Sequence, residues 1–156
     1  EEFFGIKSIL VETAEADDII MTLIRRMKHN HNCIIATDHD MIQVLDKARM
    51  FDLRGNEITI SYISNKCIGS NDMTSESYLK AKLIVGDKSD NIPQVFERVG
   101  WKKAWSLMSD VETLKEKLKD SKAINRLKLN SKLIDCKYIP SGIQKDIINS
   151  YIQTKS

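Results

Sequence analysis

Two carboxylates stand three residues apart in the stretch 86–93, which is rich in turn-forming residues and follows an apolar helical run. Asp87 and Asp90 would repel each other at close range unless a divalent cation or a basic partner lay between them. A metal site is one interpretation, and an exposed turn that caps the helix explains the pattern equally well. A calcium-binding EF-hand loop is excluded, because Ile92 and Arg98 stand where it needs Gly and Glu.

Two further groups of acidic residues occupy the ends of predicted elements. Glu15, Asp17 and Asp18 lie in the first turn of a predicted helix. Acids there also stabilise a helix through its dipole, by roughly 0.3–1 kcal/mol each. Asp38 and Asp40 follow a predicted strand, at the place where open parallel sheets bind ligands. An aspartyl-phosphatase motif there would need a Thr two places beyond, which is absent. Because Mg²⁺ and Mn²⁺ prefer carboxylate oxygens, the three groups together favour a divalent metal site.

The spacing of the apolar residues predicts the elements that position these acids. Residues 6–11 and 33–37 read as buried strands around a helix at 14–27, which indicates a βαβ unit with parallel strands. The predicted fold class is therefore α/β, with a partial parallel sheet followed by a helical C-terminal region. The remaining predictions are a short helix at 41–45, a β-hairpin with strands at 49–53 and 57–62, a helix at 75–85 capped by Ser75, two short helices between 95 and 108, and helices at 110–118, 123–133 and 143–152.

Composition limits the class of protein. The chain has 156 residues, of which 42% are hydrophobic and 29% charged, so we expect one soluble globular unit. A net charge of +2 is too balanced to indicate nucleic-acid binding by itself, but bases outnumber acids in residues 100–137. Trp101 and Trp105, four residues apart, are interpreted as core residues.

Cysteine usage and hydropathy predict the compartment. The three cysteines are widely separated and form no C-x-x-C pair, which favours reduced intracellular thiols. The sequence has no apolar run of eighteen residues and no basic segment typical of a signal peptide, so no membrane partner is expected. We expect a cytoplasmic protein.

Three motifs in this order resemble those of the metal-dependent 5′ nucleases, which comprise flap endonucleases, the 5′ nuclease domains of bacterial DNA polymerases and phage exonucleases. The family pattern E-A-D-D appears at residues 15–18, T-x-D-x-D-x-x-Q resembles residues 37–44, and G-D-x-S-D-N-I-P matches residues 86–93. The order and spacing agree, and the resemblance covers essentially the whole chain. Residues toward the C-terminus are similar to the ribonuclease H of T-even bacteriophages.

The resemblance implies a PIN-like, resolvase-like core that hydrolyses phosphodiester bonds with two Mg²⁺ ions, Mn²⁺ being a possible substitute. Expected substrates are RNA primers in RNA–DNA hybrids and 5′ ends or flaps of duplex DNA, during DNA replication or repair. Carried over residue by residue, the acids form a first metal site with Glu15, Asp17, Asp18 and Asp38 and a second with Asp40, Asp87 and Asp90. The residues predicted to be catalytic are Glu15, Asp17, Asp38, Asp40 and Asp90.

The family also carries a helix-three-turn-helix that grips duplex DNA, expected here at residues 90–108. Gly100, Lys102 and Lys103 are the predicted DNA-binding residues, and the lysines would contact phosphates without reading sequence. Where relatives carry G-x-G-x-K-T, this chain has Arg98 for the first Gly and Lys103 for the Thr. These replacements weaken the expectation of a tight turn and of the K⁺ ion that some relatives bind there.

The resemblance divides the chain into residues 1–85, the C-terminal part of the nuclease core, and residues 86–156, a helical region that binds duplex DNA. The family's first strand, its basic helical arch and two further Asp ligands have no counterpart in these 156 residues. We therefore expect the C-terminal portion of a nuclease whose N-terminal half lies in the same or a separate chain. The alternative is a catalytically inert duplex-DNA-binding module, favoured by the basic residues at 100–137.

Overall fold

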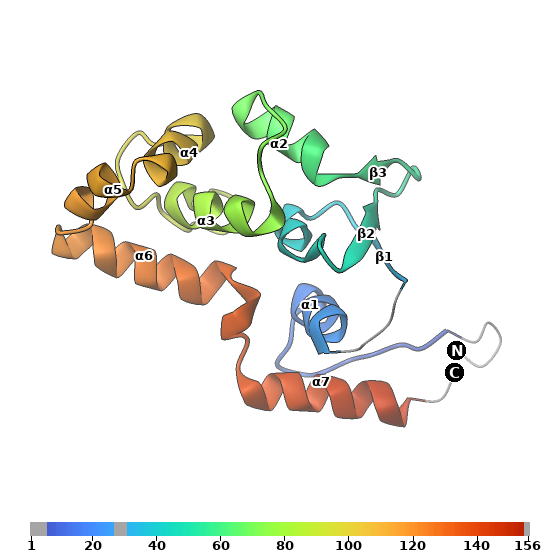
Figure 1. Ribbon diagram of the computed structural model, residues 1–156. Coiled ribbons are helices and arrows are strands. Elements are labelled where there is room, and N and C mark those ends of the chain that lie inside the picture. Colours follow the sequence, from blue (N-terminus) through green and yellow to red (C-terminus); the bar gives the residue numbers. More distant parts are fainter. Residues whose placement is uncertain (1–5, 27–30, 155–156) are drawn as a thin grey trace.

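The computed structural model describes residues 6–26 and 31–154 as a small sheet at one side of a larger set of helices (Figure 1). The sheet has the order β1-β2-β3, with strands Asn32–Ile35, Ala48–Phe51 and Glu57–Ile58. β1 and β2 run parallel and are joined by a 3₁₀ helix, η1 (His39–Val44), whereas β2 and β3 form an antiparallel hairpin. The predicted α/β class with a partial parallel sheet is confirmed.

Two helices, α1 and α3, pack directly against η1. α3 lies at the centre, because it packs against η1, α4 and α6, while α1 packs against η1 and α7 (Figure 1). Among the described helices, none combines the length and the apolar character that crossing a membrane requires. The bounds are α1 Ala16–Arg26, α2 Ile60–Ile68, α3 Ser75–Val85, α4 Trp101–Ser109, α5 Val111–Lys117, α6 Ser121–Ile134 and α7 Ser141–Gln153, with a second 3₁₀ helix, η2, at Cys136–Tyr138.

The hydrophobic core is centred on η1 and α3. Met41 and Ile42 of η1 are buried with Tyr78, Ala81 and Ile84 of α3 in one cluster. α3 is covered by η1, α4 and α6, so only Glu76 and Lys80 of this helix are exposed, and its buried residues include the polar side chains of Ser75 and Lys82. Because Asp40 begins η1 and the turn with Asp87 follows α3, the same packing brings these two segments together.

The predicted strand at 6–11 is wrong. Residues 6–11 form no strand, and Ile6 and Leu10 are exposed. The segment runs beside α7, where Lys7 donates a hydrogen bond to the Tyr151 carbonyl at 3.1 Å and lies over the Tyr151 ring (Figure 1). A strand needs a neighbouring strand to pair its backbone groups, and the described residues offer none here. The expected βαβ unit is therefore absent, and the parallel pair is β1 with β2.

The predicted hairpin is confirmed, but its second strand is shorter than expected. β3 ends at Ile58 because Thr59 caps α2, its Oγ1 accepting a hydrogen bond from the Tyr62 amide at 3.2 Å. The predicted cap of the helix at 75–85 is off by one residue, because Thr74 and not Ser75 caps α3. The helix predicted at 14–27 is present as α1, and its predicted end at Met27 lies outside the described residues.

Of the two helices predicted between 95 and 108, the second is present and the first is absent. Residues 95–100 contain turns and no helix, and α4 begins at Trp101. The two helices that flank the turns are instead α3 and α4, which meet where Tyr78 stacks on Trp101 with ring centroids 4.9 Å apart. Arg98 adopts a left-handed φ of 57°, so a sharp turn forms although the family's Gly is missing.

Gly86 sets the path of the chain out of α3. Its φ of 73° with ψ of −168° lies in a region that side chains disfavour, and a Cβ there would stand 2.5 Å from the Ile92 carbonyl oxygen. The Gly86 amide closes α3 on the Lys82 carbonyl at 2.8 Å. Glycine is therefore required where the chain turns toward Asp87.

We predict that Gly86→Ala lowers the free energy of unfolding by about 1–3 kcal/mol, because it combines a strained backbone with a clash against the loop. Gly142→Ala is the matched control: Gly142 lies in α7, a Cβ there meets nothing within 4 Å, and Ala favours a helix by up to about 1 kcal/mol. Urea denaturation of both variants measures the difference. Equal stability of the two would contradict this role of Gly86.

Candidate metal centre

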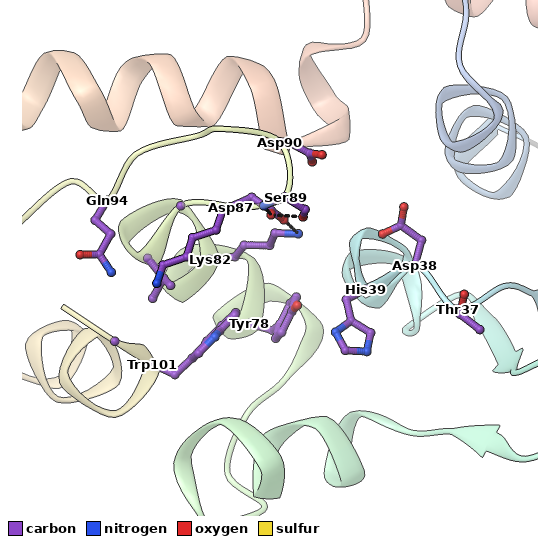
Figure 2. A pocket seen from close by; sticks show the side chains of 14 residues that line it. Thr37, Asp38, His39, Tyr78, Lys82, Asp87, Ser89, Asp90, Gln94 and Trp101 are labelled. Atoms are coloured by element: carbon purple, nitrogen blue, oxygen red, sulfur yellow. Dashed lines mark hydrogen bonds and ion pairs between the residues drawn. The ribbon is translucent and has the colours of Figure 1, made fainter. Parts of the chain in front are cut away.

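A hollow of 760 Å³ opens between the start of η1, one face of α3, the loop after α3 and the start of α4 (Figure 2). Asp38, Lys82, Asp87 and Asp90 line its polar side. Tyr78 and Trp101 stack on its other side and form an apolar wall. The hollow therefore joins a charged wall, which can bind ions or phosphates, to an aromatic one.

Three of the predicted acids converge beside this hollow. Asp40, Asp87 and Asp90 each offer a carboxylate oxygen, and these oxygens lie within 4.8 Å of one another. Asp40 and Asp87 are half-buried, whereas Asp90 is exposed at the rim. The acids come from two segments, η1 and the loop after α3, that lie about forty-seven residues apart in sequence.

Local hydrogen bonds fix each acid-bearing segment. Asp38 caps η1, since its Oδ1 accepts a hydrogen bond from the Asp40 amide at 2.8 Å. The loop after α3 is closed by two backbone hydrogen bonds between Asp87 and Ile92, of 3.0 and 2.7 Å. Asn91 permits the tight loop by adopting a φ of 58°, a conformation that Asn tolerates better than most residues. The side chains of Asp40 and Asp87 therefore start from well-defined backbones.

A buried lysine lies between two of the acids. The Lys82 ammonium group contacts the Asp40 carboxylate and lies 2.9 Å from Asp87 Oδ2 (Figure 2 shows the second contact). Only 5% of Lys82 is exposed. A lysine is almost never buried without a partner, because its charge loses water contacts. The basic partner that the sequence analysis left open is therefore present, and it joins η1 to α3.

This arrangement determines the ionisation of Asp87. Partial burial by itself raises the pKa of the Asp87 carboxyl, but hydrogen bonds from Ser89 and Lys82 and the charge of Lys82 outweigh it and lower the pKa to about 2. Asp87 is therefore ionised throughout the neutral range. On the opposite wall, burial raises the pKa of Tyr78, so its hydroxyl stays neutral.

The acids of α1 do not join this cluster. Within the described residues, the group with oxygens close enough to share one ion contains Asp40, Asp87 and Asp90 alone. Asp17 and Asp18 accept hydrogen bonds from amides of their own turn, with Asp18 Oδ2 3.2 Å from the Glu15 nitrogen. Asp38 lines the hollow but is occupied as the cap of η1.

The predicted DNA-binding residues lie together at the start of α4. Gly100 is the residue before its first turn and makes no side-chain cap, so the first amides of α4 face outward. Lys102 and Lys103 are exposed in that turn. Gly100 also lines the hollow, which places this helix end beside the carboxylate cluster.

Lys82 is the site residue that the sequence analysis missed. The signal for it was present: Lys82 stands four residues after Tyr78 on α3, so the two share the buried face of an otherwise apolar helix. A charge on such a face needs a partner of opposite charge, and Asp87 follows five residues later. A lysine on an apolar helical face before an acidic turn could therefore have been predicted to enter the site.

We predict that Lys82→Met, in metal-free solution at pH 7, lowers the free energy of unfolding by roughly 3–5 kcal/mol, because it leaves two partly buried carboxylates without their counter-charge. The pKa of Asp87 should also rise. In the unsubstituted protein, the lowered pKa of Asp87 stabilises the fold at any pH above 3.8, the ordinary pKa of an aspartate. This contribution is lost as the pH falls toward about 2. Denaturation with a chelator present, at pH 7 and pH 2.5, measures both effects.

Lys80→Met is the matched control on the same helix. Lys80 pairs with Glu76 at the surface, where its side chain is 60% exposed, and such pairs contribute about 0–1 kcal/mol. A loss of stability in Lys82→Met no larger than that in Lys80→Met would contradict the role given to the buried ammonium group.

Two family models match the chain, one over each half. Residues 2–77 match the family model described as 5′-3′ exonuclease, N-terminal resolvase-like domain, and residues 69–156 match the one described as T4 RNase H, C terminal. The chain is 28% identical over 125 residues to a 5′-3′ exonuclease of Halalkalibacterium halodurans, which covers 76% of this chain and 41% of that protein. It is 32% identical over 124 residues to DNA polymerase I of Caldicellulosiruptor bescii, covering 72% of this chain and 14% of the polymerase.

Solved structures show the same fold. The bacteriophage T5 flap endonuclease, in a pseudo-enzyme-product complex with DNA and metal ions, superposes with a TM-score of 0.64 at 21% identity, over 92% of this chain and 62% of that one. The T5 5′-exonuclease with bound zinc ions superposes with a TM-score of 0.60 at 24% identity, over 90% of this chain and 61% of that one.

The predicted resolvase-like α/β core is thereby confirmed, as is the resemblance to 5′ nucleases. The chain spans less than half the length of the H. halodurans exonuclease and a still smaller share of the polymerase. The second family model alone covers more than half of the chain, so the chain belongs to the family that this model describes, T4 RNase H, C terminal, and its N-terminal half matches the resolvase-like domain of 5′-3′ exonucleases.

Proposed function

We propose that this chain is the C-terminal portion of a structure-specific 5′ nuclease that hydrolyses phosphodiester bonds with Mg²⁺ during DNA replication or repair. The observation that carries the proposal is the convergence of Asp40, Asp87 and Asp90, from two distant segments, to within 4.8 Å. Like charges at this distance repel unless positive charge lies between them, and the single charge of Lys82 offsets only part of the repulsion. The proposed substrates are 5′ ends or flaps of duplex DNA and RNA primers in RNA–DNA hybrids.

The donor set fits a divalent cation. Three carboxylates carry three negative charges and Lys82 supplies one positive charge, which leaves two negative charges at the cluster. Carboxylate oxygens are the ligands that Mg²⁺ and Mn²⁺ prefer. Asp40, Asp87 and Asp90 are also the three acids that the family resemblance assigns to one of two metal sites. We propose that they hold that ion.

The other metal site is proposed to use Asp38 together with the acidic first turn of α1. Asp17 and Asp18 accept hydrogen bonds from amides of their own turn, and neither they nor Glu15 belong to the cluster of Asp40, Asp87 and Asp90. We propose that the N-terminal half of the nuclease contributes the remaining ligands of this site. Two ions, when bound, would activate a water molecule and stabilise the negative charge that develops on the phosphate and the leaving oxygen.

The residues of this chain would prepare the site for that chemistry. Lys82 and the amide and hydroxyl of Ser89 keep Asp87 ionised and oriented. Asp90 stands exposed at the rim, where an incoming phosphate would pass. The stacked rings of Tyr78 and Trp101 close the other wall and limit the access of water.

Duplex DNA is proposed to bind across the start of α4. Lys102 and Lys103 are exposed in its first turn, and the outward-facing amides there suit a phosphate. Arg98 places a further positive charge in the turn before α4. The related T5 flap endonuclease was solved with DNA, which supports duplex DNA as the partner.

The N-terminal half of the nuclease is proposed to pair beside β1. The chain covers 41% of the H. halodurans exonuclease, so much of a complete nuclease lies outside it. β1 is one of the two outer strands of the described sheet, and Ile35 is 68% exposed there. A strand added at this edge, from the same or a separate chain, would cover Ile35.

We predict that Asp40→Asn and Asp90→Asn each reduce Mg²⁺-dependent cleavage of a 5′-flap substrate by more than about 100-fold, because each removes a charged ligand. The assay uses the nuclease with its N-terminal half present. Asp72→Asn, at an exposed position outside the cluster, is the control and should cleave normally. Full cleavage by both cluster variants would refute the proposed function, whereas DNA binding without any metal-dependent cleavage would favour the inert duplex-binding module.

We predict that Lys102→Ala and Lys103→Ala weaken binding to duplex DNA of any sequence. Each lost phosphate contact should reduce the slope of log K against log salt concentration by about 0.9. Lys145→Ala, at an exposed position on α7, is the matched control and should leave the slope unchanged. Fluorescence anisotropy at several salt concentrations, in Ca²⁺ to prevent cleavage, gives the slopes. The same slope in the unsubstituted protein and all three variants would exclude the start of α4 as the DNA-binding surface.

A further inference from the structure

A buried amide on α6 holds the loop that carries Asp87 and Asp90. The Asn130 side chain is fully buried, and its Nδ2 donates hydrogen bonds to the carbonyls of Leu83 and Pro93, both at 2.9 Å. Leu83 lies in the last turn of α3, where carbonyls lack partners within the helix. Pro93 ends the loop. One side chain therefore ties both ends of the acid-bearing loop to α6.

A second amide holds the segment that carries Asp40. Gln43 belongs to η1, three residues after Asp40. Its Nε2 donates to the Ile134 carbonyl at 3.1 Å, and its Oε1 accepts a hydrogen bond from the Cys136 amide at 3.0 Å. Both partners lie at the C-terminal end of α6 or directly after it. The two acid-bearing segments are thus fastened to the same stretch, residues 130–136.

The chemistry of Asn130 indicates more than packing. Its Oδ1 is buried and finds no hydrogen-bond partner among the residues that the structure describes, which is unfavourable compared with an apolar side chain of similar volume. The orientation of the amide follows from its surroundings, because both neighbours are carbonyl oxygens and only the NH₂ group can donate to them. An unsatisfied oxygen at this position is therefore tolerated in exchange for the two bonds to the loop.

Lys82 alone does not define the spacing of the acids. A flexible ammonium group attracts Asp40 and Asp87 but imposes little direction, whereas shared coordination of one small ion needs oxygens at set positions. The two amides supply direction, because each makes two hydrogen bonds to backbone groups. They fix η1 and the loop separately against one rigid helix.

We propose that Asn130 and Gln43 are positioning residues, which hold η1 and the loop after α3 on residues 130–136 so that Asp40, Asp87 and Asp90 can share one divalent cation. This inference rests on the proposed function, since it concerns the same carboxylates. Neither amide touches the ion or the substrate. Both act on the geometry of the cluster through the backbone.

The test compares Mn²⁺ binding by Asn130→Leu, Gln43→Met and the unsubstituted nuclease, with the N-terminal half present and no DNA. Electron paramagnetic resonance of free Mn²⁺ gives the dissociation constant. We expect an increase of about 10-fold for each substitution, as is typical for groups that orient metal ligands. Asn125→Leu, at an exposed position of the same helix, is the matched control and should bind as the unsubstituted protein does.

A second measurement separates positioning from a general loss of stability. With either variant, the Mg²⁺ concentration for half-maximal cleavage should rise about 10-fold, while kcat at saturating Mg²⁺ stays close to normal. A purely structural defect would instead lower the amount of folded enzyme, and hence the rate, equally at every Mg²⁺ concentration. Circular dichroism and limited proteolysis monitor the folded fraction.

Gln43→Glu keeps the inference testable if Asn130→Leu does not fold. It retains an acceptor for the Cys136 amide and removes the donor to Ile134, so a smaller rise in the Mn²⁺ dissociation constant is expected than with Gln43→Met. Unchanged Mn²⁺ binding by the folded variants, with normal binding by the unsubstituted nuclease, would overturn the positioning role alone. Failure of the unsubstituted nuclease to bind Mn²⁺ would overturn the proposed function as well.

Discussion

The contact of one buried ammonium group with two carboxylates is the interaction on which the rest of the site depends. Lys82 extends from the central helix α3 and meets Asp40 of η1 and Asp87 of the following loop, so it connects the sheet side of the molecule to the helical side. Removing three charged groups from water is unfavourable unless they compensate each other. Attraction between these charges therefore holds η1, α3 and the following loop together, at the place where a divalent cation would also attract the carboxylates.

Local sequence signals predicted most of the elements, and the failures share one cause. The caps, the hairpin turn and the periodic helices depend on neighbouring residues, so α1, α3 and α6 could be read directly from the chain. The strand expected at 6–11 depends on a partner strand, which no local pattern reveals, and the described residues provide none. β3 was extended too far because apolar residues near Ile60 suit either a strand or a helix, and the Thr59 cap decides for the helix.

The site was predictable in part for the same reason. Spacing and family motifs identified Asp40, Asp87 and Asp90, and the structure brings these three together. The acids of α1 were grouped with them on the expectation that successive α/β elements share one sheet edge, but residues 6–11 form no strand, and that geometry is lost. The contacts of Gln43 and Asn130 and the Lys82–Asp40 pair join residues that lie 37 to 93 positions apart, so only three-dimensional packing reveals them. Asp87, the other partner of Lys82, follows it by five residues.

The outer position of β1 has a consequence for handling the protein. Backbone groups along an edge strand can pair with any extended chain. Ile35 presents an apolar side chain at that edge, and Ile6 and Leu10, which precede α1 in the sequence, are also exposed. Natural edge strands are often protected by lysine, proline or a bulge, and the sequence Cys33-Ile34-Ile35 offers none of these. Prepared by itself at high concentration, the chain is thus a template for self-association, and any strand paired along this edge would remove that tendency.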